Sequence, residues 1–447
     1  MGQFITLQDL FLTPIYLLII YGILYFLRTS ITDKEMKKFF ILGYSVKVVG
    51  AIFFGLVFQF IYGYGDTFFY FAGSGIARDA FLNDMGSYWE LLFQEMNNYS
   101  SSQTYNYAQR MPYYGDKPSF AICLIGSVFS ILSFHTYIVT CLFFALISFA
   151  GSWQMYRAWA DLYPVLKKQL GWAIFFVPSI FFWASGIVKD SITFAALGFA
   201  FSAFHFGVIR RKKTYANIFM LLLSLYTLYI IKLYILLCFL PALGWWFYTQ
   251  YTKQIGSKFL RVVFAPFLLV IGGGFVFYSF NNLIKGTEYD LDRVAERAFI
   301  TADWIHQMSD EGSSYDIGLD QMDGTIGSLI KLYPKGVFIT LFRPFVWEVK
   351  NFNMLLAGLE NLILLFLTFQ VIKNQKWKVI FNRLKTEQMV LVCLIFTIFF
   401  SGIIGITSSN FGTLVRYRIP ILPFYTIALV ILGYKKPKIK KMRRIKV

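Results

Sequence analysis

Long apolar runs recur from one end of this chain to the other and alternate with shorter polar segments. Apolar runs of about 17–25 residues are typical of membrane-spanning helices, whereas the strands of a membrane barrel would give alternating segments of about 10 residues. The pattern predicts an all-α fold, a polytopic transmembrane helical bundle that forms a single membrane domain over residues 1–447. We expect about eleven crossings, at residues 10–27, 39–62, 137–156, 172–187, 191–209, 215–231, 233–249, 262–281, 353–372, 388–407 and 417–434.

One further apolar run, residues 118–134, is not counted among these crossings. If it crossed the membrane, the basic loops before and after it would fall on opposite sides. Its starting proline and its serines suit a helix that lies at the membrane surface, or that dips in and returns. We therefore expect it to belong to a large extracytoplasmic segment, residues 63–136, that carries interfacial helices.

The charges along the chain are distributed unevenly. The net charge is +18, and the loops predicted to be cytoplasmic hold 27 of the 42 Lys/Arg residues but only four of the 24 acids. Cytoplasmic loops of membrane proteins carry such an excess of Lys and Arg. The tail 435–447 holds eight basic residues and no acid, which indicates a cytoplasmic anchor next to anionic lipid and argues against nucleic acid as a partner. We expect a multi-pass protein of the cytoplasmic (inner) membrane, with a second large outer segment at residues 282–352.

Metal-binding patterns are weak in this sequence. The four cysteines lie in apolar segments without paired spacing, and the three histidines are scattered. We therefore expect neither disulfides nor a thiolate or histidine metal site. A divalent cation, Mg²⁺ or Mn²⁺, stays compatible with a site built from carboxylates.

The most informative stretch is Gly63-Tyr64-Gly65-Asp66, where the second apolar run ends in two glycines and a carboxylate. A carboxylate at the membrane edge can act as a general base on a polar substrate while a lipid-borne partner arrives from the side. The alternative is an ordinary interfacial aspartate. The predicted topology brings other charged residues to the same membrane face: Asp116, Lys117, Lys189, Asp190, Lys232, Arg343, Glu348, Arg416 and Arg418. Such a mixture suits a lipid phosphate, which cations hold while a carboxylate deprotonates an acceptor.

Several of these residues also have a plain structural interpretation. Lys189 can extend to the membrane surface while Asp190 caps the following helix. Arg343 and Glu348 either pair with each other or, with their aromatic neighbours, line a wall for a sugar ring. Arginines on the outer side run against the positive-inside rule, so Arg416 and Arg418 favour an anionic ligand.

Two charged residues interrupt the apolar runs themselves. We expect Lys47 to extend toward the cytoplasm and assign it no role. Glu360 must be paired or protonated there, and it would suit a proton relay in a transporter.

The layout resembles the GT-C superfamily of integral-membrane glycosyltransferases, which use polyprenyl-phosphate-linked sugars. The resemblance covers roughly residues 39–210: a spanning helix, a long outer loop with Asp66 near its start, candidate interfacial helices at 68–96 and 118–134, the string Asp116-Lys117-Pro118-Ser119, and a short outer loop with Asp190. Two features depart from the family pattern, an additional span at 10–27 and Ser119 in place of the second proline of the string. The pair of outer arginines also looks like polysaccharide polymerases and O-antigen ligases, which grip lipid pyrophosphate with arginines.

The resemblance implies an enzyme that moves a sugar from a polyprenyl-phosphate carrier to a glycan, lipid or protein acceptor outside the membrane, with inversion at the anomeric centre. Asp66 and Asp190 would be catalytic, with Asp66 as the general base. Lys117, Lys189, Lys232, Arg343, Glu348, Arg416 and Arg418 would bind substrate. Two alternatives stay open: a polymerase or ligase that uses a pyrophosphate-linked oligosaccharide, and a lipid or polysaccharide transporter.

Overall fold

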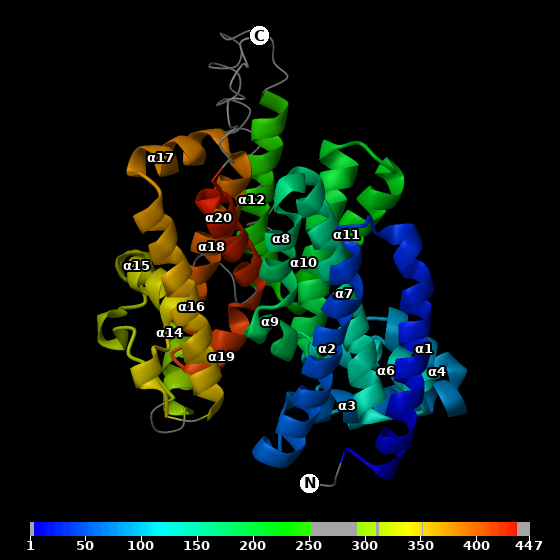
Figure 1. Cartoon of the computed structure of the whole chain (residues 1–447). Helices are drawn as coiled ribbons and strands as arrows, with labels where there is room; N and C mark the ends of the chain where they lie inside the picture. Colours follow the sequence, from blue (N-terminus) through cyan, green and yellow to red (C-terminus); the bar gives the residue numbers. More distant parts are fainter. Residues whose placement is uncertain (1–3, 253–292, 310–312, 351, 436–447) are drawn as a thin grey trace, which may run out of the picture.

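The computed structural model describes residues 4–252, 293–309, 313–350 and 352–435, and within these ranges the chain is helical with no β-strand. Nine helical segments of this described part are long and apolar enough to cross a membrane. They are α1 (Leu7–Ile31), α2 (Lys37–Val57) extended by η1 (Phe58–Tyr62), α7 (Tyr137–Leu162), α10 (Lys189–Ala203) extended by η3 (Phe204–Ile209), α11 (Thr214–Ile231), α12 (Leu233–Thr252), α16 (Phe352–Asn374), α18 (Gln388–Thr407), and α19 (Phe411–Tyr417) continued by η6 (Ile419–Ile421) and α20 (Leu422–Gly433). The predicted all-α bundle is confirmed, and the helices are those expected of a multi-pass membrane protein (Figure 1).

Two of the predicted crossings are not among these nine. The segment 262–281 lies outside the described residues. The segment 172–187 is not one continuous helix, because α8 (Lys167–Phe175) ends before α9 (Pro178–Trp183) begins. Pro178 explains the break: its ring disfavours a helical conformation at the preceding residue, and Val177 is extended, with φ −77° and ψ 120°.

Shorter helices complete the bundle. The helices α3 (Asp66–Asn83), α4 (Met85–Phe93), α5 (Ser102–Arg110) and α6 (Lys117–Leu132) gather at the end where the N-terminus lies (Figure 1). The helix α6 covers most of the run 118–134 and is too short for the nine, so its predicted place at the membrane surface stays a prediction. The other short elements are η2 (Pro164–Leu166), α14 (Val294–Gln307), η4 (Leu319–Gln321), α15 (Ile326–Phe342), η5 (Val346–Glu348) and α17 (Trp377–Thr386).

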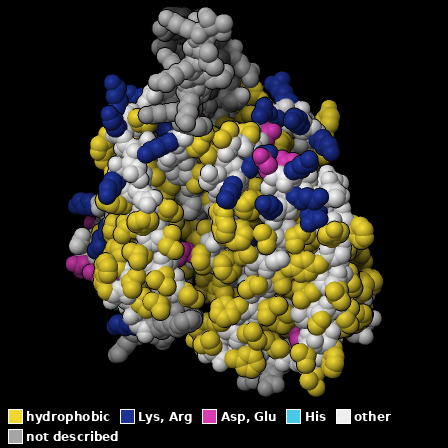
Figure 2. All heavy atoms as spheres, viewed as in Figure 1, with side chains coloured by type: hydrophobic (Ala, Val, Ile, Leu, Met, Phe, Trp, Pro, Cys, Tyr) yellow, Lys and Arg dark blue, Asp and Glu magenta, His cyan; other side chains and the backbone are white. Residues whose placement is uncertain are grey.

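Side chains of different character cover different parts of the surface. Figure 2 shows apolar side chains over most of the visible face, with Lys and Arg gathered toward the end where α17 and the C-terminus lie. A belt of exposed apolar side chains is what lipid-facing helices require. The basic end is the one that the charge pattern predicts to be cytoplasmic.

Glycines allow the helices at the centre to approach closely. A Cβ atom added to Gly151 of α7 would lie 2.4 Å from Ala195 Cα of α10, and one added to Gly198 would lie 2.2 Å from Gly151 O. Lipid tails are as apolar as the side chains they would replace, so close packing through small residues holds helices together in a membrane. The α7–α10 pair thereby places the start of α10, with Lys189 and Asp190, at the same end of the bundle as α3.

Candidate functional site

Four of the residues singled out in the sequence meet at the end of the bundle where α3 begins. Asp190 lies at the centre: its Oδ1 forms an ion pair with Lys232 Nζ, and its Oδ2 accepts from Arg416 Nε at 2.6 Å. The same guanidinium reaches Asp66, with 3.4 Å between Nη1 and Oδ2. These side chains come from α3, α10, the α11–α12 junction and α19, so the cluster exists only in the folded chain.

The backbone before Asp66 explains its position. The last turn of α2 widens into the π-helical η1, and the chain then reverses through Gly63 (φ +69°) and Gly65 (φ +151°). Only glycine adopts the second of these conformations without strain, and a Cβ on Gly65 would lie 2.5 Å from the Phe58 ring. Asp66 consequently falls in the first turn of α3, where the helix dipole favours a carboxylate.

Asp190 is held differently, by burial and complete pairing. Its side chain is 3% exposed and that of Lys232 is 8% exposed. A buried charge is tolerated only when it is paired, and here one carboxylate serves two cations. Because both oxygens of Asp190 are occupied, this residue is suited to orient Lys232 and Arg416 rather than to take up a proton.

A looser rim surrounds this buried centre. The Asp66 side chain is 49% exposed, and Asp116, at 48%, pairs with Lys189 at 3.4 Å. Tyr113 Oη donates to Asp66 Oδ1 at 3.0 Å. Burial, and then the Asp66 charge, raise the pKa of Tyr113, so the phenol keeps its proton and remains a donor. Asp66 is therefore the accessible carboxylate of the cluster.

Aromatic rings that the sequence analysis did not assign line the two cations. The Arg416 guanidinium carbon lies 5.7 Å from the centre of the Trp183 ring, and Lys232 Nζ lies 4.9 Å from that of Tyr417. Such cation–π contacts help to hold cations that are partly removed from water. Tyr417 stands between two arginines in the sequence, and this position was a signal that it belongs to the site. Nothing near Trp183 in the sequence indicated that it would contact Arg416.

Arg418 corrects the expectation that two arginines line the outer mouth together. Its side chain is fully buried and pairs with Glu360 at 2.9 Å. Glu360 in turn accepts from Ser179 N at 2.7 Å and from Ser179 Oγ at 2.9 Å. The reason is helical geometry: Arg418, the residue after α19, keeps a right-handed helical backbone, and residues two positions apart differ by about 200° around a helix axis, so the side chains of Arg416 and Arg418 point to opposite sides.

The remaining predicted site residues do not join the cluster. Arg343 and Glu348 form an ion pair with each other, with Arg343 Nε 2.9 Å from Glu348 Oε1, so the simpler of the two interpretations describes their contacts. The Arg343 guanidinium also lies 5.1 Å from the ring centre of Phe411. Lys117 is exposed at the start of α6, and it is its neighbour Asp116 that contacts Lys189.

Lys47 is a second correction, because it does not extend to the cytoplasm. Its side chain is 1% exposed, and Nζ donates to Ile180 O at 3.1 Å and to Ala184 O at 2.8 Å. Ala184 directly follows the last residue of the short helix α9, and Ile180 O, within α9, also accepts from Ala184 N at 3.2 Å. Lys47 thereby fixes the segment that leads into Lys189 and Asp190.

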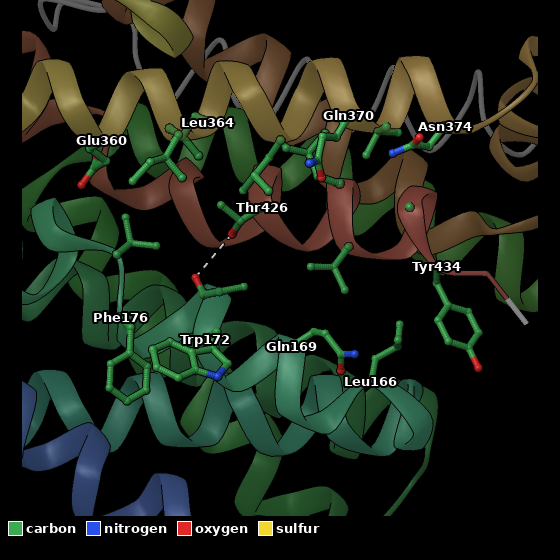
Figure 3. A pocket seen from close by; sticks show the side chains of 18 of the residues that line it. Leu166, Gln169, Trp172, Phe176, Glu360, Leu364, Gln370, Asn374, Thr426 and Tyr434 are labelled. Atoms are coloured by element: carbon green, nitrogen blue, oxygen red, sulfur yellow. Dashed lines mark hydrogen bonds between the residues drawn. The ribbon is translucent and has the colours of Figure 1, made fainter. Parts of the chain in front are cut away.

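A cleft of about 750 Å³ runs along the bundle between α8, α16 and α20. Glu360 lies near one end, and Asn374 and Tyr434 lie near the other (Figure 3). Its walls are mainly apolar, and the polar or charged residues among them include Gln169, Gln370 and Thr426 besides those at the two ends. Figure 2 shows this cleft as a furrow on the apolar face. A furrow of this character suits a hydrocarbon chain.

The part of the chain that the structure describes contains no group of three or more His, Cys, Asp or Glu residues that could hold a metal ion. No protein-family model, curated protein or solved structure matches the chain. The resemblance to the GT-C superfamily therefore rests on the sequence features alone, and the site has to be interpreted from its own geometry.

Proposed function

We propose that the protein is a membrane glycosyltransferase that moves a sugar from a polyprenyl-phosphate carrier to an acceptor on the outer side of the cytoplasmic membrane. The observation that carries this proposal is the bridge made by Arg416. It joins Asp66, 350 residues away in sequence, to Asp190, 226 residues away. An accessible carboxylate thus lies beside cations at the end of a membrane bundle, which is the combination that glycosyl transfer from a lipid phosphate requires.

The ion pairs of Asp66 and Asp190 differ in strength, so we assign these two carboxylates different roles. Asp190 is buried with its two cations, whereas the Asp66–Arg416 contact is long, at 3.4 Å, and half exposed on the acid side. Exposed ion pairs contribute about 0–1 kcal/mol, so a phosphate can displace Asp66 from Arg416 at little cost. Binding of the donor phosphate would then release Asp66 beside the acceptor.

The reaction follows from these positions. The acceptor hydroxyl loses its proton to Asp66, and its oxygen forms the new bond to the anomeric carbon. The bond between that carbon and the phosphate oxygen breaks, and the electron pair leaves with the phosphate. Arg416 and Lys232 stabilise the charge on the departing phosphate. Attack on the face opposite to the phosphate inverts the anomeric centre.

The apolar cleft supports a lipid-linked donor. Its Glu360 end is tied through an ion pair to Arg418, two residues from Arg416. An isoprenoid chain lying in the cleft would therefore approach the Asp66–Asp190 cluster from the side of α19 that faces away from Asp190. A soluble nucleotide sugar would have no use for such a furrow.

Asp116 provides a matched control for Asp66. Both carboxylates are about half exposed and each contacts one cation at 3.4 Å. Asp66→Asn should lower kcat for transfer from polyprenyl-phosphate-linked sugars by about 100-fold or more, as expected for loss of a general base. Asp116→Asn should retain kcat within about tenfold. The reconstituted protein is assayed against a panel of such donors, and undiminished turnover in Asp66→Asn refutes the assignment.

The polymerase or ligase alternative has less support, because it relies on both arginines and Arg418 is committed to Glu360. It predicts that Arg416→Ala is far more damaging than Asp66→Asn. The transporter alternative predicts substrate flux across liposomes without any covalent product. One panel of donors, followed for product and for flux, separates the three.

A further inference from the structure

A second cavity, of about 690 Å³, lies at the other end of the bundle and has no part in the proposed transfer reaction. It is formed where α7 and η3 end and α11 begins, together with residues from the α1–α2 connection. The lining residues Phe199 to Phe206 lie on α10 and η3 and follow Asp190 along this helical segment, so a rise of 1.5 Å per residue places them roughly 14 to 24 Å from Asp190 along the helix axis. Any ligand here is distinct from the sugar donor.

Four cations and two carboxylates line this cavity: Arg157, Lys167, Lys212, Lys213, Asp33 and Asp161. Part of this charge is already neutralised. Lys167 pairs with Asp33 at 2.7 Å and with Glu35 at 3.2 Å. Asp161 contacts His205 Nε2 at 2.8 Å and Arg210 Nη2 at 2.9 Å. Both carboxylates of the lining are therefore occupied.

The other three cations have no carboxylate partner among the residues that the structure describes. Arg157 donates only to Gln154 Oε1, at 3.1 Å, and its guanidinium lies 5.9 Å from the ring centre of Phe206. Lys212 and Lys213 are exposed. Because a guanidinium has five N–H donors, Arg157 retains several for a ligand. Three cations without a carboxylate partner among the described residues therefore line this cavity.

The loop that carries the two lysines is held in an unusual conformation. Arg211 (φ +52°) and Lys213 (φ +44°) are both left-handed, a conformation that costs an L-residue about 1–2 kcal/mol. Three hydrogen bonds hold the loop in place: Lys212 N donates to Phe206 O at 2.7 Å, and Asn217 Nδ2 donates to the carbonyls of Lys212 at 2.7 Å and Lys213 at 3.3 Å. Backbone strain of this kind is frequent at ligand clamps.

We propose that this cavity binds a phosphate-bearing anion, held by Arg157, Lys212 and Lys213. A guanidinium beside two ammonium groups matches the several oxygens of a phosphate. The volume falls in the range of about 300–1,000 Å³ that holds drug-sized ligands, so the phosphate carries a further group, which the apolar part of the lining (Phe199 and Met220) accommodates. The same chemistry occurs in the headgroup of an anionic lipid and in a soluble diphosphate.

Binding is measured on the full-length protein with two probes, so that the source of the phosphate is distinguished. In one arm, protein in phosphatidylcholine nanodiscs containing phosphatidylglycerol is released for native mass spectrometry, and retained phosphatidylglycerol is counted. In the other arm, pyrophosphate and ADP are titrated against the detergent-solubilised protein. Arg157→Gln and the double variant Lys212→Gln/Lys213→Gln are compared with wild type. The control is Lys376→Gln/Lys378→Gln, which removes two exposed charges from the region of α17 at the same end of the bundle.

We expect the affinity for at least one probe to fall about tenfold in each cavity variant, which is the effect of roughly one lost phosphate contact. The control should stay within about twofold of wild type, and Arg157→Lys, which keeps the charge but loses the guanidinium donors, should recover only part of the loss. If Arg157→Gln does not fold, the exposed lysine pair carries the test alone.

If the cavity variants retain less phosphatidylglycerol than wild type, the ligand is a lipid headgroup. If they bind pyrophosphate or ADP more weakly than wild type, the ligand is a soluble one. The proposal is overturned if neither probe binds, or if the cavity variants and the α17 control weaken binding equally, because the effect is then a general one of surface charge. Neither result depends on glycosyl transfer, since no sugar donor is present.

Discussion

Asp190→Asn is the most informative single change in this protein, because it removes the negative charge at the centre of a buried cluster. Lys232, 8% exposed, and Arg416, 19% exposed, would then face each other without the carboxylate that separates them. Arg416 retains only its long contact with the exposed Asp66, at 3.4 Å, and Lys232 retains no carboxylate at all among the described residues. An unpaired ammonium would be left inside the bundle.

The expected cost follows from what is left behind. Breaking a buried ion pair by removing one partner costs about 3–5 kcal/mol, because the remaining charge is buried and unpaired. Adding Lys232→Met removes that charge and keeps a side chain of similar length. The double variant should therefore regain most of the loss and lie within about 1–2 kcal/mol of wild type, because no unpaired ammonium is left in the bundle.

The assay is thermal unfolding of the purified protein in one detergent, followed by tryptophan fluorescence and by recovery of the monomer in size-exclusion chromatography. For a chain of this size, 3–5 kcal/mol corresponds to a fall of roughly 5 °C in the apparent Tm. Asp79→Asn is the control, because its ion pair with Arg78 is half exposed and 3.7 Å long, and it should leave the Tm unchanged. An unchanged Tm in Asp190→Asn, or a double variant no more stable than the single one, refutes the reasoning.

Two further predictions concern the scaffold. Gly151→Val should destabilise the bundle by about 3 kcal/mol or more, because the added Cβ would lie 2.4 Å from α10. Gly22→Val on α1 is the control and should not destabilise it, because the space around Gly22 is open. Equal yields of the two folded variants would contradict this packing. Burial, reinforced by the charge of Arg78, lowers the pKa of His135, so the native state prefers the neutral imidazole. The unfolded chain takes up a proton on this histidine below about pH 6.5. The native state therefore has its full stability above that pH and loses stability as the pH falls below it. Lowering the pH from 7.5 to 5.5 should therefore reduce the apparent Tm of wild type more than that of His135→Asn, which tolerates the left-handed backbone at this position; identical pH profiles would refute it.

The helices of this protein could be predicted from the sequence because their signal is local. A run of about twenty apolar residues needs no partner to be recognised, and nine such segments are present in the described part of the chain. The one misjudged segment, 172–187, contained the reason for its break in Pro178. The prediction gave more weight to the apolar composition of this segment than to its proline. Neither feature indicated that Lys47 would bind the carbonyls of Ile180 and Ala184.

The candidate site was predictable only in part. The predicted topology placed Asp66, Asp190, Lys232 and Arg416 on one membrane face, and the folded chain brings all four together. The same argument placed Arg418 beside them, and there it was wrong. Sidedness is a property of a whole segment, whereas contact depends on the direction in which each side chain leaves its helix.

The sequence by itself determined three features: the helical segments, the uneven distribution of basic residues, and the carboxylates and cations near the ends of spans. Each of these is a property of residues along the chain and needs no knowledge of contacts in space. Only the tertiary structure decided which charge meets which. It left Asp66 half exposed, closed Asp190 between two cations and turned Arg418 into the interior. The physical reason is that burial and pairing depend on distances in space, and residues hundreds of positions apart acquire such distances only when the helices pack.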